Sequence, residues 1–509
     1  MTRRVICAAI FLLLSSAAVH AACSGSGTAW SCSAGSSSFD VQAAINSAKD
    51  GAVITFANGS YTWAGLANFS TSKGVTLICA SVGGCTVRAI GSVLGMNQPI
   101  GTITKFYRIS GFVFDSISNN TGVIRWDATC GPPACDATLT QVRIDHNAFN
   151  LLPGGVAIFL GDGGSATYIY GVVDHNAVNS LGSVQLLFMV GRLDNSPPVP
   201  SPQGTSSNLF IEDNAINITT MTNSGQGCVD GWANNNWVIR HNNSLNCLWT
   251  SHGEKHNGGP QNIEFYDNSI KVDSGSIRQN ERDCYRCFHH QGSGEFITFN
   301  NSFSSFIGES KTPMDLGEYR AFPNTIDVTN SPLGAQCDGS QAIDGNRAPT
   351  SSNHGYPCFR QPGRDTNGTL VPIYVWNNFW SNTRDPIVLN LDDFGLAPDY
   401  FANHMQLNRD AYNAVSGSAQ TSPTSPFDGT TGMGFGTLAN RPVTCTTGAE
   451  TGGGVGYFAT DQGPQGTLYR CSATNTWTIQ YQPYTYPHPL VTSDPTSVAA
   501  PTNVIAVVN

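Results

Sequence analysis

The chain has 509 residues, of which only 12% are charged, and its formal net charge is −10 at pH 7. Gly is abundant (54 residues), as are Asn, Ser and Thr, and this composition favours an all-β chain with many tight turns over a helix-rich enzyme. The acidic balance argues against a nucleic-acid-binding protein.

The N-terminus has the pattern of a secretory signal peptide. A positive region, an apolar stretch and a small-residue exit follow in order: Arg3-Arg4, Val5–Ala18 and Val19–Ala21. We expect residues 1–22 to form the signal, with cleavage after Ala21 or Ala22. The apolar stretch is too short to cross a bilayer, and no later segment has the roughly 20 apolar residues that a spanning helix needs. Cys23 stands where a lipoprotein cysteine would, although His20 fits that motif poorly. The sequence predicts an exported protein, extracellular or periplasmic, without a membrane span.

The remaining cysteines agree with this compartment. Cys7 lies in the signal, and the others form close sequential couples: Cys23/Cys32, Cys79/Cys85, Cys130/Cys135, Cys228/Cys247, Cys284/Cys287, Cys337/Cys358 and Cys445/Cys471. An even number of cysteines in an exported chain indicates a set of disulfides, although spacing alone leaves their connectivity open. A zinc site is the alternative for Cys284 and Cys287, but no second Cys-x-x-Cys motif lies near them.

A degenerate repeat runs through the middle of the chain. Each copy is a short strand of alternating apolar residues, followed by a polar residue, Asn and a further apolar residue. The copies are VRIDHNAFN (142–150), GVVDHNAVN (171–179), LFIEDNAIN (209–217), WVIRHNNSL (237–245), IEFYDNSIK (263–271), FITFNNSFS (296–304) and IYVWNNFWS (373–381). The asparagines align as Asn147, Asn176, Asn214, Asn243, Asn268, Asn301 and Asn378. Apart from the last gap they recur every 25 to 38 residues, a period typical of a solenoid.

The repeat favours a coil of stacked parallel strands. Strict alternation gives each strand one buried and one exposed face, and a single rung cannot bury its apolar side without neighbours. Asn tolerates the left-handed conformation of a sharp bend, and its side chain can bond the backbone or the Asn of the next rung. The Leu-rich frame of a leucine-rich repeat and the uniform blades of a propeller are both missing.

Two further segments extend this interpretation to the N-terminal part of the chain. DVQAAINSAKDGAVITFANGSYTW (40–63) looks like a helical cap and a first rung, and YRISGFVFDS (107–116) looks like an early rung. With the asparagines, they resemble the pectate-lyase-like superfamily of right-handed parallel β-helices over roughly Phe39 to Asn382. The resemblance implies an all-β right-handed parallel β-helix (a solenoid) with an N-terminal helical cap. That fold hosts lyases, hydrolases, esterases, epimerases, phage tailspikes and adhesins, so it does not by itself define a function.

The expected organisation has four parts. Residues 1–22 are the signal peptide and 23–420 the β-helix. Residues 421–490, rich in Gly, Thr, Pro and Tyr, are expected to form a small C-terminal β-hairpin appendage. Residues 491–509 have the composition of a linker.

In the resembled superfamily, the Asn turn joins the second strand of a rung to the third, and the groove follows the first strand. Applied here, this places the first strands at VIRWD (123–127), VAIFLGD (156–162), LLFMVGR (186–192), GCVDGW (227–232), LWTSHGEK (248–255) and CYRCFHH (284–290). Because rungs stack about 4.8 Å apart, residues distant in sequence would form one strip.

The strip contains the candidate site residues. We expect a catalytic set of His252, Lys255, Arg286 and His289. We expect a substrate-binding set of Arg192, Trp232, Trp249, Tyr285 and His290, with Trp232, Trp249, Tyr285 and also Tyr319 exposed to stack on sugars. Asp230 and Glu254 are the candidate ligands of a calcium ion, which needs more oxygen ligands than these two supply. These candidate residues can also have purely structural roles. Glu-Lys neighbours often form a solvated turn, and a lone His is often a structural residue.

A polysaccharide lyase suits this set best. Elimination removes the proton α to a uronate carboxylate and expels the sugar oxygen at the next carbon, so the site must neutralise the carboxylate and hold a base. Arg286 or calcium can neutralise it, Lys255 or His252 can be the base, and His289 can return a proton to the leaving oxygen. The expected partner is an acidic polysaccharide, and the expected state is a monomer.

Family motifs are only partly present. RIDHNAF (143–149) is similar to the WIDH-type segment of pectate lyases, with Arg143 in place of Trp, and the aspartate-rich calcium cluster has no match. Two alternatives therefore stay open. A glycoside hydrolase would need two facing carboxylates, such as Asp230 with Glu254 or Asp315. A non-catalytic carbohydrate-binding or tailspike-like coil would need only the aromatic residues.

Overall fold

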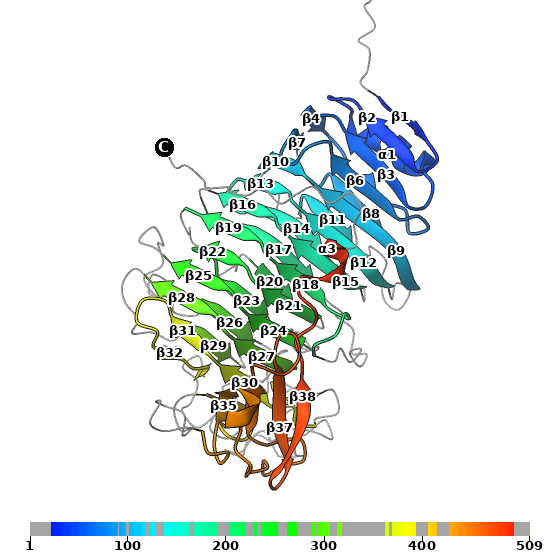
Figure 1. The fold of residues 1–509 in the computed structure, drawn as a ribbon. Helices are drawn as coiled ribbons and strands as arrows, with labels where there is room; N and C mark the ends of the chain where they lie inside the picture. The colour runs from blue at the N-terminus through cyan, green and yellow to red at the C-terminus, as the bar shows by residue number, and fades with distance from the viewer. Residues whose placement is uncertain are drawn as a thin grey trace, which may run out of the picture.

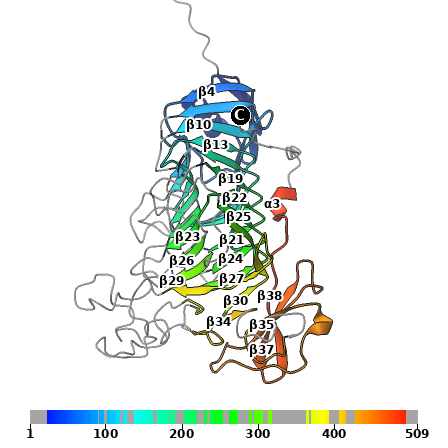
Figure 2. The same ribbon diagram turned by 90° about the vertical axis from the view of Figure 1, so that its left-hand side faces the viewer.

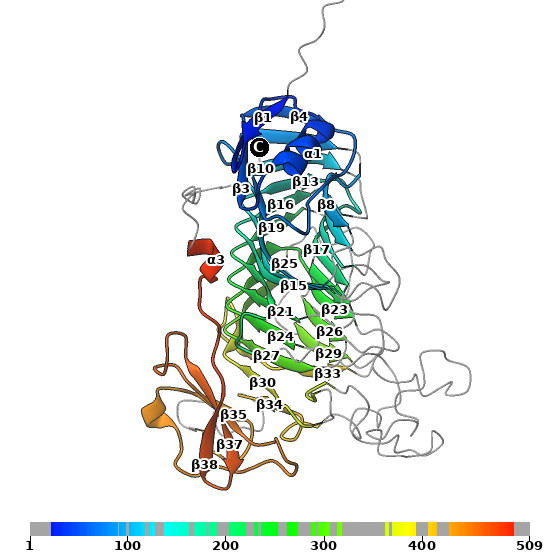
Figure 3. The same cartoon turned by 90° about the vertical axis from the view of Figure 1, so that its right-hand side faces the viewer.

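The computed structural model describes residues 22–89, 91–97, 101–117, 122–127, 137–161, 167–180, 182, 184–190, 203–219, 229–232, 236–252, 262–272, 287–291, 294–305, 313–317, 362–365, 369–392, 406–414 and 427–492. Within them the chain forms the predicted right-handed parallel β-helix, seen from three sides in Figures 1, 2 and 3. The expected signal segment, except for Ala22, lies outside the described residues. No helix in the described part of the chain is long and apolar enough to span a membrane.

Three long sheets make up the coil. Sheet A contains β1 (Cys23–Ser26), β2 (Ala29–Cys32), β3 (Ala52–Phe56), β6 (Val75–Cys79), β9 (Gly101–Ser110), β12 (Ala137–Asp145), β15 (Thr167–Asp174), β18 (Leu209–Glu212), β21 (Asn236–Arg240), β24 (Asn262–Tyr266), β27 (Glu295–Phe299), β30 (Ile373–Trp376) and β34 (Ala411–Asn413). Sheet B contains β4 (Gly59–Trp63), β7 (Cys85–Ala89), β10 (Phe112–Ile117), β13 (Ala148–Leu151), β16 (Ala177–Ser180), β19 (Ala215–Ile218), β22 (Asn243–Leu245), β25 (Ser269–Val272), β28 (Ser302–Ser305), β31 (Asn378–Trp380) and β32 (Pro386–Ile387). Sheet C contains β5 (Ala67–Asn68), β8 (Leu94–Asn97), β11 (Ile124–Asp127), β14 (Val156–Leu160), β17 (Gln185–Val190), β20 (Val229–Trp232), β23 (Trp249–His252), β26 (Phe288–Gln291), β29 (Met314–Gly317) and β33 (Asn390–Asp392).

Each rung contributes one strand to each sheet, in the order C, A, B. Neighbouring strands of one sheet are therefore mostly three strands apart in the chain. Within the described coil only the β1–β2 and β31–β32 pairs are antiparallel. Inward side chains stack into one continuous apolar core, as with Phe114 and Phe149, whose ring centroids are 5.2 Å apart. Burial of this shared interior is what a single rung could not achieve alone.

The N-terminal end of the coil is closed by α1 (Ser38–Ser47), as the resemblance implied. Ser37 caps the helix in a capping box with Asp40, which satisfies backbone N–H groups of the first turn. The helix buries Val41, Ala44 and Ile45 against the first rungs. Without this cover, the apolar interior would be exposed to water at the end of the stack.

The asparagine ladder is present, with one member different from the prediction. Side-chain amides run from Asn147 to Asn176, Asn214, Asn242, Asn268, Asn301 and Asn378, each Nδ2 donating to the next Oδ1 over 2.8–3.1 Å. The prediction of Asn243 as a ladder member is wrong. Asn243 lies exposed at the start of β22, and Asn242 takes its place in the ladder. The left-handed conformation also belongs to the residue before each ladder asparagine, as at His146 and Asp213.

Three predicted disulfides are confirmed: Cys23–Cys32, Cys79–Cys85 and Cys445–Cys471. Cys247 and Cys287 are also disulfide-bonded, so Cys287 is not a thiolate ligand of zinc. The other predicted members, Cys130, Cys135, Cys228, Cys284, Cys337 and Cys358, lie outside the described residues.

The C-terminal appendage is a four-stranded sheet rather than a lone hairpin. It contains β35 (Met433–Gly436), β36 (Gly456–Ala459), β37 (Thr467–Ala473) and β38 (Thr476–Tyr481), with the 3-10 helix η1 (Leu438–Asn440) between β35 and β36. It packs on the outer face of sheet A and forms a second apolar core there, in which Phe299 stacks on Trp376 and Phe458 lies tilted against Trp376. Residues 482–492, which we call the strap, then run back along sheet A and end in α3 (Pro489–Thr492) beside β15.

Candidate active site

One row of polar side chains follows the outer face of sheet C. Strand register pairs Asp230 with Thr250, Thr250 with His289, and His289 with Asp315, so the four residues lie on consecutive rungs. We call them the sheet C row. The residues just before them, Val229, Trp249, Phe288 and Met314, are buried in the interior. Because side chains alternate across a strand, the sheet C row faces away from the core.

His289 and Asp315 form a hydrogen-bonded pair in this row. Nδ1 of His289 lies 2.8 Å from Oδ2 of Asp315, and Asn390 Nδ2 donates to Oδ1 of the same carboxylate over 3.3 Å. A carboxylate only accepts, so Nδ1 carries a proton and Nε2 holds the lone pair of the neutral ring. Asp315 is fully enclosed, whereas His289 keeps 6% exposure. The pair is therefore an oriented imidazole that can give or take a proton at Nε2.

Thr250 adds an unsatisfied group beside His289. Its hydroxyl oxygen is buried and has no hydrogen-bond partner among the described residues, and Thr250 is only 8% exposed. Buried hydroxyls are nearly always bonded in folded proteins, so one left open suits a ligand that completes its hydrogen bonding. Asp230, on the other side of Thr250, is 3% exposed.

Two predicted binding residues lie in the interior instead. Trp249 is fully buried and its Nε1 donates to Ser244 Oγ over 3.3 Å, so the expectation of an exposed ring is wrong. His290 is also fully buried, with Nδ1 2.5 Å from Ser251 Oγ. Both residues lie on the inward phase of their strands, one position away from Thr250 and His289.

The remaining predicted site residues cannot be placed by their side chains. Trp232 and His252 pair through the backbone at the ends of β20 and β23, but their side chains lie outside the described part. The others fall entirely outside the described residues: Arg192, Glu254, Lys255, Tyr285, Arg286 and Tyr319. Sequence reasoning had not singled out Thr250, and it had considered Asp315 only as a hydrolase carboxylate. The sequence signal that could have identified Thr250 and Asp315 was their position on the first strands of their rungs.

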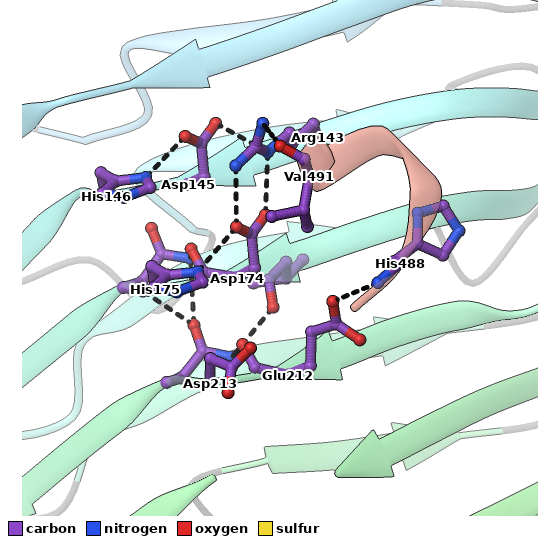
Figure 4. A network of polar contacts seen from close by, with 12 residues as sticks. Arg143, Asp145, His146, Asp174, His175, Glu212, Asp213, His488 and Val491 are labelled. Carbon is purple, nitrogen blue, oxygen red and sulfur yellow. Dashed lines mark hydrogen bonds and ion pairs between the residues drawn. The ribbon is translucent and has the colours of Figure 1, made fainter. Parts of the chain in front are cut away.

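A second charged cluster lies on sheet A, where the RIDHNAF segment places Arg143, Asp145 and His146 (Figure 4). Arg108 binds both oxygens of Asp145 at 2.7 Å, and Arg143 binds both oxygens of Asp174 at 3.0 Å. Burial raises the pKa of Asp145, but hydrogen bonds from Arg108 and His146 and the charge of Arg143 outweigh it and hold that pKa well below its usual range.

This cluster has the outline of a metal site, because ligand atoms of Asp145, His146 and Asp174 lie within 4.8 Å of one another. Both carboxylates, however, are already neutralised by arginine, so a cation would have to displace these ion pairs. The strap also covers the cluster: Arg143 Nη1 donates to the Leu490 carbonyl over 3.1 Å. We interpret the cluster as a structural network that holds the strap on the coil.

Further along the same face, Arg240 joins the strap to the coil. It is fully buried, binds Glu212, and donates to the carbonyls of Tyr484 and Thr485. Glu212 in turn accepts the backbone N–H of His488 over 2.8 Å (Figure 4). A buried arginine with every donor engaged stabilises a fixed geometry rather than a reactive one.

No protein-family model matches the chain, and no curated protein matches it in sequence. Among solved structures, the chain is similar to an alginate lyase from Paenibacillus sp. str. FPU-7, with 14% identity, a TM-score of 0.28, and coverage of 54% of this chain and 95% of that one. It is also similar to a mutant of the PL6 family alginate lyase AlyGC, with 13% identity, a TM-score of 0.29, and coverage of 71% of this chain and 53% of that one.

Proposed function

We propose that the protein is an exported polysaccharide lyase that cleaves a uronate-containing polysaccharide by β-elimination at the sheet C row. The observation that carries the proposal is the His289–Asp315 hydrogen bond, which orients an imidazole on the outer face of the coil. The sequence resemblance supplies the substrate class. The cysteine pairs bonded in the structure support export, because disulfides persist in oxidising compartments.

In the proposed reaction, a base removes the proton α to the uronate carboxylate while the carbon–oxygen bond at the next carbon breaks. A double bond forms between these carbons, and protonated His289 gives its Nε2 proton to the leaving oxygen. Asp315 holds the ring in place and stabilises its protonated form. The open hydroxyl of Thr250 binds a substrate hydroxyl. From the sequence, Lys255 or His252 is the base and Arg286 neutralises the carboxylate.

Calcium is not assigned a step. Calcium takes about six to eight oxygen ligands. Near Thr250, the sheet C row offers only the carboxylate of Asp230. The other described carboxylate of the row, Asp315, is held by His289 and Asn390. A calcium site at Asp230 would depend on Glu254, which stays a prediction.

The same geometry argues against the hydrolase pairing of Asp230 with Asp315. The two residues are three rungs apart, about 14 Å at the backbone, whereas paired glycosidase carboxylates stand about 5 to 10 Å apart. Asp315 also points its carboxylate at His289. An elimination that uses His289 as the proton donor fits the row better.

The test is to incubate the purified protein with pectate, alginate, glucuronan and glycosaminoglycans, with and without calcium, and to follow the ultraviolet absorbance of the unsaturated product. His289→Gln should lower the rate about 10²- to 10⁴-fold, the usual contribution of a positioned acid or base. The matched control is His175→Gln, since His175 also bonds a carboxylate (Asp174, 2.9 Å) but lies at the turn after sheet A.

Three results would contradict the proposal. New reducing ends without absorbance would indicate hydrolysis, and binding without any cleavage would indicate a non-catalytic coil. Equal activity of the wild-type and His289→Gln proteins would show that the elimination site lies elsewhere.

A further inference from the structure

The outer row of sheet C continues upstream of Asp230. Register pairs Arg125 with Phe159, Phe159 with Phe188, and Phe188 with Asp230. Arg125 and Phe159 are partly exposed, whereas their strand neighbours Ile124, Trp126, Ile158 and Leu160 are buried in the core. Arg125 and Phe159 therefore lie on the same outward face as His289, nearer the N-terminal end of the coil.

The two side chains contact each other in a defined way. The Arg125 guanidinium lies over the Phe159 ring, 5.3 Å from its centroid. Phe159 is on the next rung toward Asp230, so the guanidinium leans along the row in the direction of His289. An arginine held on an aromatic face keeps its planar donors in a fixed orientation, which suits a carboxylate.

Arg88, Arg108, Arg143 and Arg240 lie on strands of the other two sheets of the coil. Arg108, Arg143 and Arg240 are buried in carboxylate pairs beneath or beside the strap. Arg88 is exposed on sheet B and lies 3.7 Å from Asp115. Arg125 is the described arginine that shares the outward face of sheet C with the candidate site.

We propose that Arg125 and Phe159 form a distant binding subsite for a carboxylate-bearing sugar of the polysaccharide whose cleavage is proposed above, and the inference rests on that function. The subsite is five rungs from His289, about 24 Å along the coil. A polymer lying along sheet C reaches both places at once, and a short oligosaccharide held at His289 does not. The protein therefore prefers long uronate chains.

The experiment compares polymer with oligosaccharides shorter than about 24 Å, the span set by rung spacing. In Arg125→Gln, the ratio of KM for polymer to KM for oligosaccharide should rise about tenfold, the loss expected for one charge-assisted contact. Arg88→Gln is the matched control, because it removes an exposed arginine from sheet B. Arg125→Lys should recover part of the effect, since it keeps the charge but not the fork of donors.

Binding is measured separately by affinity electrophoresis in polyuronate gels, in the His289→Gln background. If Arg125→Gln weakens the retardation of the double variant and Arg88→Gln leaves it unchanged, the result supports the subsite. This holds even if the wild-type protein cleaves no polymer, in which case only the lyase assignment fails. An unchanged KM ratio and unchanged retardation would overturn the inference, as would an equal loss on long and short substrates. Phe159→Leu, which keeps an apolar side chain, repeats the test if Arg125→Gln does not fold.

Discussion

The hydroxyl of Tyr481 donates a 2.6 Å hydrogen bond to Oε2 of Glu264, across 217 residues of sequence. Glu264 is fully buried on sheet A and also accepts bonds from the Gly204 N–H and Asn262 Nδ2. Burial raises the pKa of Glu264, and these hydrogen bonds act in the opposite direction. The contact joins the last strand of the appendage to the middle of the coil.

Tyr481→Phe should therefore destabilise the protein by about 1 to 3 kcal/mol, because it leaves a buried carboxyl oxygen without its donor. Urea unfolding followed by tyrosine and tryptophan fluorescence measures the change. Tyr469→Phe, on the neighbouring strand β37 and only half-buried, is the control. Equal unfolding midpoints for the two variants would show that the Tyr481 bond adds no stability.

The ladder predicts a difference between two adjacent asparagines. Asn242 Nδ2 donates to the Ile211 and Arg240 carbonyls and to Asn268 Oδ1, and its own Oδ1 accepts from Asn214. Asn242→Ala should lower the free energy of unfolding by about 2 to 4 kcal/mol, since several buried groups lose partners at once. Asn243→Ala, at an exposed position, should change it by less than about 0.5 kcal/mol. Similar losses in the two variants would contradict the ladder register.

The strap should become less stable in acid because of His488. Burial, together with the charges of Arg240 and Arg143, lowers the pKa of His488 to about 3. Its Nδ1 accepts the Leu490 N–H over 3.2 Å, which requires the neutral ring. A depressed pKa contributes stability that is present above the ordinary value of 6.5 and is lost as pH falls toward 3.

His488→Asn removes this titration and keeps an acceptor. Between pH 7 and pH 4 the wild type should lose about 1 to 3 kcal/mol more stability than the variant, as proton linkage requires. Denaturant unfolding at a series of pH values measures the difference, and limited proteolysis of residues 482–492 locates it. Parallel pH profiles for the two proteins would show that His488 is not the group responsible.

The His289–Asp315 pair predicts the effect of a single-atom change. Asp315→Asn keeps the size of the side chain but removes the negative charge that stabilises the protonated ring of His289, the proton donor of the proposed reaction. We expect kcat on the cleaved polyuronate to fall about 10²-fold or more, as for loss of an oriented acid. Asp385→Asn, at an exposed site before β32, should leave kcat unchanged. A full rate in Asp315→Asn would remove Asp315 from the mechanism.

Much of the architecture was predictable because its signals are local. Alternating apolar residues define the strands, and recurring asparagines define the turns, so the coil follows from short segments. The order of the strands within a rung was what the resemblance implied. The sheet C row was also predictable in outline, since first strands at a fixed place in each rung must stack. Tertiary packing was needed to assign the faces: Asn242 or Asn243, His289 or His290 and Trp249 or Thr250 are neighbours, and a shift of one residue exchanges inside and outside.

The sequence by itself determined the parallel coil, because periodicity needs no knowledge of distant contacts. Its close cysteine couples indicated disulfides whose connectivity the spacing left open, and the N-terminal cap was an expectation from the resemblance. Only the tertiary structure decided that Asp315 orients His289, that Arg125 shares the outer row of sheet C, and that the strap covers Arg143 and Arg240. These relationships join residues from different rungs or from opposite ends of the chain. Their energies come from burial and hydrogen bonding that exist only once the rungs have stacked.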